Sequence, residues 1–153
     1  MSENKKVDYE EILSNIYQKY IKKQNIWSNT IEELSKRITC ELKMSINLSA
    51  DATSQRQMLI DERTNEYFKM YRDYPKLKQI RKQLFEKYAG KYPYKTNAGE
   101  KQKLIDADVA YQEAQMDYIQ NYINFLSESI KTVDHIIYSV KNKIELYNVT
   151  GLD

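Results

Sequence analysis

The sequence predicts an all-α fold, and three features of the chain lead to this prediction. Apolar residues recur every three or four positions along most of the 153 residues, which is the spacing of one face of a helix. No segment of useful length alternates apolar and polar residues as a strand would. Helix breakers are few: both Pro and two of the three Gly fall between Pro75 and Gly99. We therefore expect long helices, a bundle or coiled-coil-like hairpin, joined by short connections.

Residues 1–50 are predicted to form an N-terminal helical segment. Their apolar stripe slips at Gln24 and then resumes. Thr30 and Glu33 have the spacing of a capping box, so either a second helix begins there or one helix bends. Residues 45–54 are small and polar, and they predict a connection that ends in a helix cap.

Residues 54–153 are predicted to form a helical hairpin. Its first arm ends near Tyr88, and Pro75 predicts a kink or a restart because proline lacks the amide hydrogen that a helix interior needs. Gly90 suits the position just past a helix, and residues 88–99 are expected to form a basic turn with Gly and Pro. The apolar side of the first arm is expected to carry Tyr67, Met70, Tyr71, Tyr74, Leu77, Ile80, Leu84 and Tyr88.

The second arm is predicted to be one long helix from about Glu100, because no Gly or Pro interrupts it. A coiled-coil pair with the first arm would bury much of its apolar stripe, but the first arm is shorter. We therefore expect the end of this helix to lack cover within the chain and to mediate oligomerisation. The residues expected in that interface are Ile137, Val140, Ile144 and Tyr147.

The net charge of +2 conceals one strongly basic segment. Residues 1–75 are neutral overall, residues 76–103 carry +7, and residues 104–153 carry −5. A near-neutral protein with one basic segment is typical of polyanion binding. The location predicted from the sequence is a reducing cytosol, because the chain has one cysteine and no apolar run of the roughly 20 residues that a bilayer requires.

The sequence contains no convincing catalytic or metal-binding pattern. His135 is the one histidine, with Asp134 beside it and Cys40 distant in sequence, and no Cys/His spacing suits a metal. Asp106 and Asp108 lie two apart on a predicted helix and so point in different directions. They are best explained as favourable charge near a helix N-terminus. We expect a protein that is not an enzyme and needs no cofactor.

The basic segment is the candidate binding site. One acidic residue, Glu86, interrupts its cations between Lys76 and Lys91, and the loop that follows alternates lysines with tyrosines. Single-stranded nucleic acid is held by basic grooves that neutralise phosphates and by aromatic rings that stack on bases. A merely solvated helix face and loop remains the alternative. The candidate DNA-binding residues are Lys76, Lys78, Arg81, Lys82, Lys87, Lys91, Tyr92, Tyr94, Lys95, Lys101 and Lys103.

The C-terminal half combines a basic helix ending in KYAGK, a short Pro-containing loop, and a long helix that contains IIYSVKNKIELYNVTG. Over residues 76–151 this order resembles the UvsY-type recombination mediators of tailed bacteriophages. Tyr88, Gly90 and Lys91 match the aromatic-x-Gly-Lys turn of that family, whereas Ile136 stands where the family commonly has Arg. The matching positions of the long helix are Ala107-Asp108, Tyr118, Phe125-Leu126, Ile130, Tyr138, Lys141-Asn142, Ile144-Glu145 and Gly151.

This resemblance implies a small helical protein that forms homo-oligomeric rings and binds single-stranded DNA. It implies a mediator that helps load a phage recombinase onto DNA coated with single-strand-binding protein, in the host cytoplasm during infection. The DNA-contacting cations of the family lie in the helix before the Gly turn, which corresponds to Lys82 and, by neighbourhood, to Arg81 and Lys87. The alternative is a structural or inhibitory coiled-coil protein of a phage that acts through protein–protein contacts.

Overall fold

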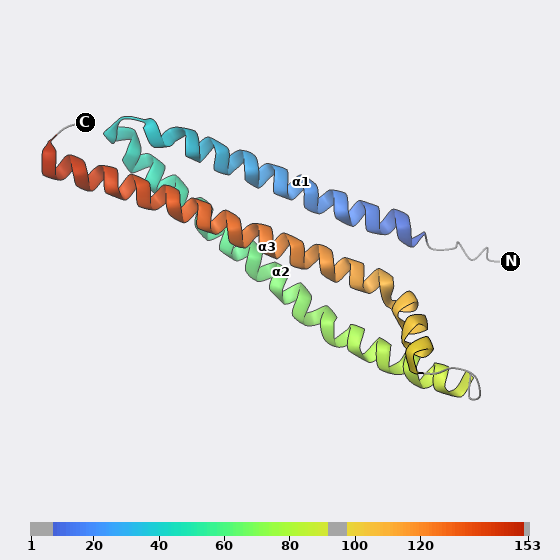
Figure 1. Ribbon diagram of the computed structural model, residues 1–153. Coiled ribbons are helices and arrows are strands. Elements are labelled where there is room, and N and C mark those ends of the chain that lie inside the picture. The colour runs from blue at the N-terminus through green and yellow to red at the C-terminus, as the bar shows by residue number, and fades with distance from the viewer. Residues whose placement is uncertain (1–7, 92–97, 152–153) are drawn as a thin grey trace. The chain divides into compact units, whose positions relative to one another are not determined.

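Three long α helices make up the described part of the chain. The computed structural model describes residues 8–91 and 98–151. It contains α1 (Tyr9–Lys36), a 3-10 turn (Arg37–Thr39), α2 (Leu42–Lys91) and α3 (Ala98–Thr150), and these two ranges include no strand (Figure 1). The predicted all-α class is confirmed. Within the same ranges, no helix has a stretch long and apolar enough to span a bilayer.

The chain divides into two compact units, and each unit takes a segment from all three helices. Unit 1 is Met1–Tyr20 with Phe68–Gln120, and unit 2 is Ile21–Tyr67 with Asn121–Asp153. Residues 50–54, between the two segments predicted from the sequence, lie inside α2.

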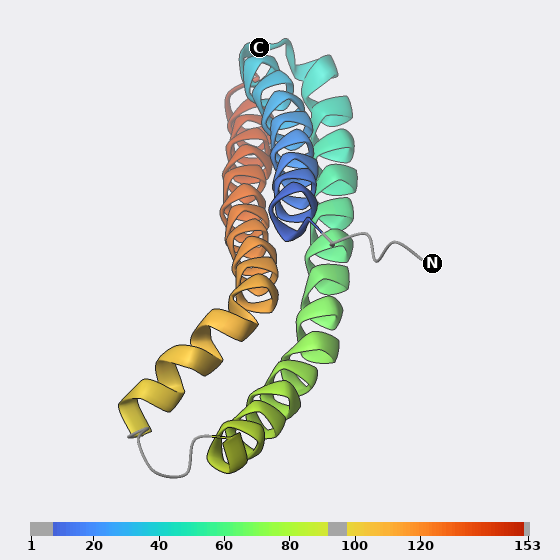
Figure 2. The same cartoon turned by 90° about the vertical axis from the view of Figure 1, so that its right-hand side faces the viewer.

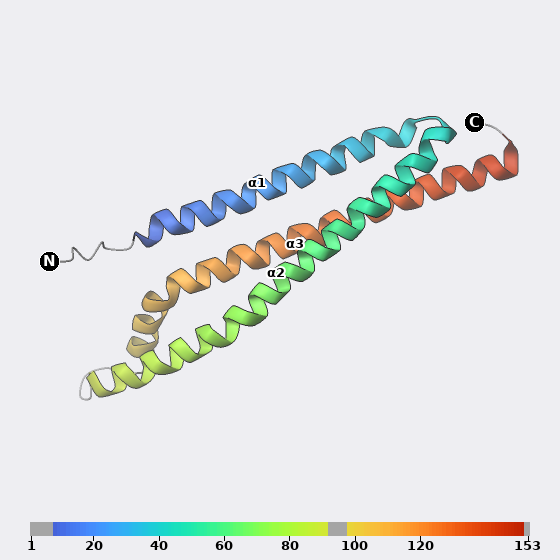
Figure 3. The ribbon, with the colours of Figure 1, turned by 180° about the vertical axis from the view of Figure 1, so that it is seen from behind.

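In unit 2 the three helical segments lie side by side, and consecutive helices run in opposite directions (Figure 2 and Figure 3). The end of α3 lies beside the connection between α1 and α2, where Lys143 Nζ donates a hydrogen bond to the carbonyl oxygen of Cys40. The unit is built around a continuous apolar core. Its buried side chains include Trp27, Leu34, Leu48, Leu59, Ile123, Leu126, Val133 and Val140.

Glu62 of α2 joins the three helices of unit 2 through partly buried hydrogen bonds. Its carboxylate accepts one from Trp27 Nε1 of α1 at 2.8 Å and one from the Tyr122 hydroxyl of α3 at 2.5 Å. Lys23 Nζ lies 3.5 Å from the same carboxylate. Burial, followed by the hydrogen bond to Glu62, raises the pKa of Tyr122 well above its usual value. These bonds satisfy polar groups that would otherwise be costly to bury.

The connection expected at residues 45–54 is wrong, because α2 begins at Leu42 and runs through them. The hydroxyls of Ser45 and Thr53 donate to carbonyl oxygens one turn earlier, at 3.2 and 2.8 Å, so these side chains are satisfied inside a helix. Leu48 and Ala52 are fully buried. The small residues that suggested a loop therefore lie on a helix whose neighbours pack closely against it.

Of the two alternatives near Thr30, the start of a second helix is wrong, because α1 is continuous. The Thr30 hydroxyl donates to the Ile26 carbonyl oxygen at 3.0 Å, as hydroxyls in a helix interior do, instead of capping a new helix. The N-terminus of α1 is capped by Asp8, whose Oδ1 accepts hydrogen bonds from the backbone amides of Glu10 and Glu11 at 3.1 and 3.2 Å.

Helix α2 passes through a proline at which the sequence predicted a kink or a restart, and through a glycine predicted to lie just past a helix end. Pro75 lies inside α2 with its side chain exposed, although proline cannot donate the backbone hydrogen bond of a helix interior. Gly90 also lies inside α2. The unbroken second arm is confirmed as α3. It ends before Gly151, whose φ of 66° is left-handed and whose amide donates to the Tyr147 carbonyl oxygen at 2.7 Å.

Unit 1 is held together by aromatic contacts between α1 and α3 and by buried apolar side chains. Tyr9 of α1 lies against Tyr111 of α3 with ring centroids 4.9 Å apart, and Tyr17 lies against Tyr118 at 5.4 Å. Tilted ring pairs at these distances add to the stabilisation that comes from burial. The buried apolar side chains of this unit are Tyr20, Leu77, Ile105, Val109 and Ile119.

Candidate nucleic-acid interface

The unit 1 segment of α2 exposes aromatic rings and lysines at helical spacing. Four rings have between 49% and 68% of their surface exposed, which is unusual for large apolar side chains. Two exposed lysines, Lys78 and Lys82, lie between them in sequence on the same side of the helix. We call this set the aromatic–lysine stripe, and its members are Phe68, Tyr71, Tyr74, Lys78, Lys82 and Phe85.

The geometry of a helix places these six side chains on one face. Successive residues turn by about 100°, so the stripe covers an arc of about 120°. Leu77 and Leu84, which are buried and half-buried, project from the other side. The stripe therefore lies on a solvent-exposed face of α2 in this unit.

Ammonium groups lie beside two of the exposed rings. Lys78 Nζ is 5.0 Å from the centroid of the Tyr74 ring on the same helix. Lys101 Nζ, from the first turns of α3, is 5.7 Å from the centroid of the Phe85 ring. Cation–π pairs of this kind keep a positive charge next to an aromatic face. A nucleotide could thus find a stacking partner and a phosphate partner at the same place.

The other described lysines of the candidate set point elsewhere. Lys76 and Lys87 are exposed but lie about 160° to 180° around α2 from Lys78, on a different side of the helix from the stripe. Lys103 is exposed on α3. Four candidates cannot be placed, because Tyr92, Tyr94 and Lys95 and the side chain of Lys91 lie outside the described residues.

Arg81 is engaged within the chain. Its guanidinium pairs with Asp106 at 2.9 Å and also with Glu113, both on α3. The hydrogen bond to Glu113, and then that to Asp106, raises the pKa of Arg81. The pKa of Asp106 is lowered by hydrogen bonds from Gln102 and then from Arg81. Two carboxylates thus offset the charge of Arg81, which makes it a weaker candidate for phosphate than Lys82.

Sequence reasoning missed the aromatic half of the stripe. Tyr71 and Tyr74 were expected on the apolar side with Leu77, but both are exposed while Leu77 is buried. Phe68 lay outside the basic segment and was not considered. The pattern is present in the sequence, because each member of the stripe follows the one before it by three or four residues, from Phe68 to Phe85.

The expectation that the end of α3 lacks cover within the chain is wrong. Val140 is 1% exposed, and Ile137, Ile144 and Tyr147 are half-buried, so the chain itself covers this side. This cover exists because α2 begins about three turns earlier than predicted and packs along this part of unit 2. The exposed apolar side chains at this end are Tyr138, Leu146 and Val149, at 64% to 85%, which we call the apolar end patch.

The remaining reactive side chains do not form a cluster. His135 is exposed, and Asp134 beside it accepts a hydrogen bond from Arg56 Nε at 2.5 Å. Cys40 is half-buried, with its Sγ 3.7 Å from the Ser45 hydroxyl. Over residues 8–91 and 98–151, no group of three or more His, Cys, Asp or Glu side chains is arranged to hold a metal ion.

Comparison with protein families, with curated proteins and with solved structures gives no match to this chain.

Proposed function

We propose that this protein binds single-stranded DNA through the aromatic–lysine stripe and acts, without catalysing a reaction, as a recombination mediator. The observation that carries the proposal is the set of four exposed rings that share one face of α2 with Lys78 and Lys82. Contiguous apolar surface left in water is unfavourable, and in soluble proteins it commonly marks a binding site.

The chemistry of the stripe favours single strands over duplexes. Base faces are open to stacking in a single strand, and each stacked ring contributes roughly 1–3 kcal/mol. Base edges in a duplex groove are read mainly by Arg, Asn and Gln, and the stripe contains none of these. Stacking and phosphate neutralisation both tolerate any base, which suits a protein that acts along a whole strand.

The mediator role rests on the resemblance of residues 76–151 to the UvsY-type proteins. Its partners would then be a phage recombinase and a single-strand-binding protein, in the bacterial cytoplasm. We also propose a closed homo-oligomer, with the apolar end patch as the contact surface in place of Val140 and its neighbours. Several stripes held together would convert weak single sites into strong binding of one strand.

Fluorescence anisotropy of a labelled single strand at several salt concentrations tests the proposal. The double variant Lys78→Gln with Lys82→Gln should bind more weakly than the parent. Its salt slope should be smaller by about 1.4, because each neutralised phosphate contributes about 0.7. The control is Lys22→Gln with Lys43→Gln, two exposed lysines of unit 2 that give the same change in net charge.

A second candidate function is a structural or inhibitory coiled-coil protein, and the apolar end patch favours it. In that case the parent would bind no single strand at low salt, while it would still self-associate or capture a partner through Tyr138, Leu146 and Val149. Equal binding by the stripe variant and the control variant would remove the stripe from the DNA site.

A further inference from the structure

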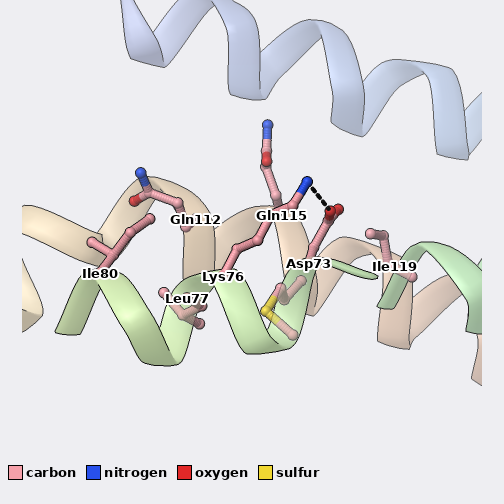
Figure 4. Close-up of a pocket in the computed structure, with 8 residues that line it drawn as sticks. Asp73, Lys76, Leu77, Ile80, Gln112, Gln115 and Ile119 are labelled. Carbon is pink, nitrogen blue, oxygen red and sulfur yellow. Dashed lines mark ion pairs between the residues drawn. The ribbon is translucent and has the colours of Figure 1, made fainter. Parts of the chain in front are cut away.

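Unit 1 contains a small cavity between α2 and α3, on a different side of α2 from the stripe. It has a volume of about 210 Å³ (Figure 4). Four of its lining side chains are apolar: Leu77, Ile80, Met116 and Ile119. Cavities that hold a drug-sized ligand measure about 300–1,000 Å³, so this one suits a single ring system.

Two glutamine amides from α3 add polar groups to this apolar lining (Figure 4). The side-chain oxygen of Gln112 is buried and accepts no hydrogen bond from any described residue. Gln115 Nε2 donates to the Tyr111 hydroxyl at 2.6 Å, so its amide already has a partner. A buried acceptor without a donor is unfavourable, and a ligand with a suitably placed N–H group would satisfy it.

A second cavity of about 190 Å³ adjoins the first and is basic. The two share Asp73, Gln115 and Ile119, and both lie within unit 1. Three cations line the second cavity, from two helices: Lys19 of α1, and Lys69 and Arg72 of α2.

Asp73 lies where the two cavities meet, and its charge is already offset. Arg72 donates to both of its oxygens, at 2.9 and 3.2 Å, and Lys76 Nζ lies at 3.9 Å (Figure 4). The hydrogen bond from Arg72 is the largest influence that lowers the pKa of Asp73, so the carboxyl stays ionised. Arg72 and Lys76 therefore offset this one carboxylate, and Lys19 lines the same second cavity, which leaves an excess of positive charge for an anion.

We propose that these adjoining cavities bind a nucleotide, with its base between α2 and α3 and its phosphate among Lys19, Lys69 and Arg72. A base is flat and apolar on its faces, as the first cavity requires. An exocyclic amino group at its edge would donate to Gln112 Oε1, which an alkyl chain cannot do. Inorganic phosphate alone would leave the apolar cavity empty. The site is separate from the stripe and does not depend on the proposed function.

Isothermal titration of the full chain with adenosine monophosphate, adenosine and inorganic phosphate tests this site. Adenosine monophosphate should bind at least tenfold more tightly than either of the others. Cytidine monophosphate should bind more tightly than uridine monophosphate, because only cytosine carries the amino group. Failure of adenosine monophosphate to bind at millimolar concentration overturns the proposal, whatever the stripe does with DNA.

Two variants locate the ligand. The Gln112→Leu variant should bind adenosine monophosphate about tenfold more weakly than the parent. It should also lose the preference for cytidine monophosphate over uridine monophosphate. Its melting temperature should not fall, because an apolar residue replaces an unpaired buried acceptor. Lys19→Gln with Arg72→Gln should reduce the affinity to that of adenosine, whereas Lys22→Gln with Lys43→Gln should leave it unchanged. Unchanged binding in both site variants refutes the assignment.

The nucleotide could be free or could be a unit of a bound strand, and competition separates these sources. If a saturating oligonucleotide lowers the affinity for adenosine monophosphate, the strand occupies the cavities. If the affinity is unchanged, the free nucleotide is the ligand. The stripe variant Lys78→Gln with Lys82→Gln should bind adenosine monophosphate like the parent. DNA binding and nucleotide binding can therefore be lost separately, and the one that is absent shows which of the two proposals has failed.

Discussion

Replacing Tyr122 by Phe removes one hydroxyl from a fully buried side chain of unit 2. Tyr122 is 0% exposed, and its hydroxyl donates to Glu62 at 2.5 Å. A hydrogen bond to a charged group contributes about 1.5–3 kcal/mol, and the ring itself is kept. Trp27 and Lys23 still contact Glu62 in the variant, so its carboxylate is not left alone. We expect the free energy of unfolding to fall by about 1.5–3 kcal/mol.

Urea unfolding followed by circular dichroism and by tryptophan fluorescence measures this change. Trp27 is the one tryptophan of the chain and donates to the same carboxylate, so its emission reports on this site. Tyr138→Phe is the matched control, because that side chain is largely exposed and its substitution should stay within about 0.5 kcal/mol of the parent. A Tyr122→Phe variant as stable as this control would refute the claim that Glu62 joins the helices.

Three further predictions concern pH, DNA and assembly. The pKa of Tyr122 is raised in the fold, so its stabilising effect is complete below the unfolded pKa of about 10 and is lost as pH rises above it. The gap in unfolding free energy between parent and Tyr122→Phe should therefore narrow above pH 10, as measured by urea unfolding. In fluorescence anisotropy, Arg81→Gln should weaken single-strand binding less than twofold, because two carboxylates already hold Arg81. Lys82→Gln should weaken it about threefold or more. The reverse order of the two variants would refute this reasoning. Val140→Asp should cost several kcal/mol by burying a charge, whereas Val149→Asp should stay folded and reduce self-association in sedimentation; a stable Val140→Asp protein would contradict the packing.

The helical class and the length of α3 could be predicted because they depend on periodicity and on the absence of breakers. The run without Gly or Pro after Glu100 became one helix as far as Thr150. The errors came from residues whose local preference was overridden by packing. Ser45 and Thr53 favour caps and turns in isolation, but inside α2 their hydroxyls bond to earlier carbonyls while Leu48 is buried against neighbouring helices.

The sequence predicts the positive charge of the candidate site, but it does not predict which side of the helix carries the exposed side chains. The sequence locates the basic segment, but which side of α2 faces solvent depends on where α1 and α3 pack. Tyr71 and Tyr74 have the same spacing as the apolar residues of the helix, and their exposure is known only from the structure. The pairing of Arg81 with Glu113 joins residues that are 32 positions apart, and no local pattern indicates it.

Photo-cross-linking of a single strand that contains bromouracil, followed by mass mapping of the attached peptides, tests the central claim most directly. Light couples this base to an aromatic ring only when the two are in contact. The account predicts that the strand becomes attached within Phe68–Phe85, at Tyr71 and Tyr74 in particular, and that 1 M salt suppresses the coupling. Attachment confined to unit 2, or a strand that couples to no residue of α2, would contradict it.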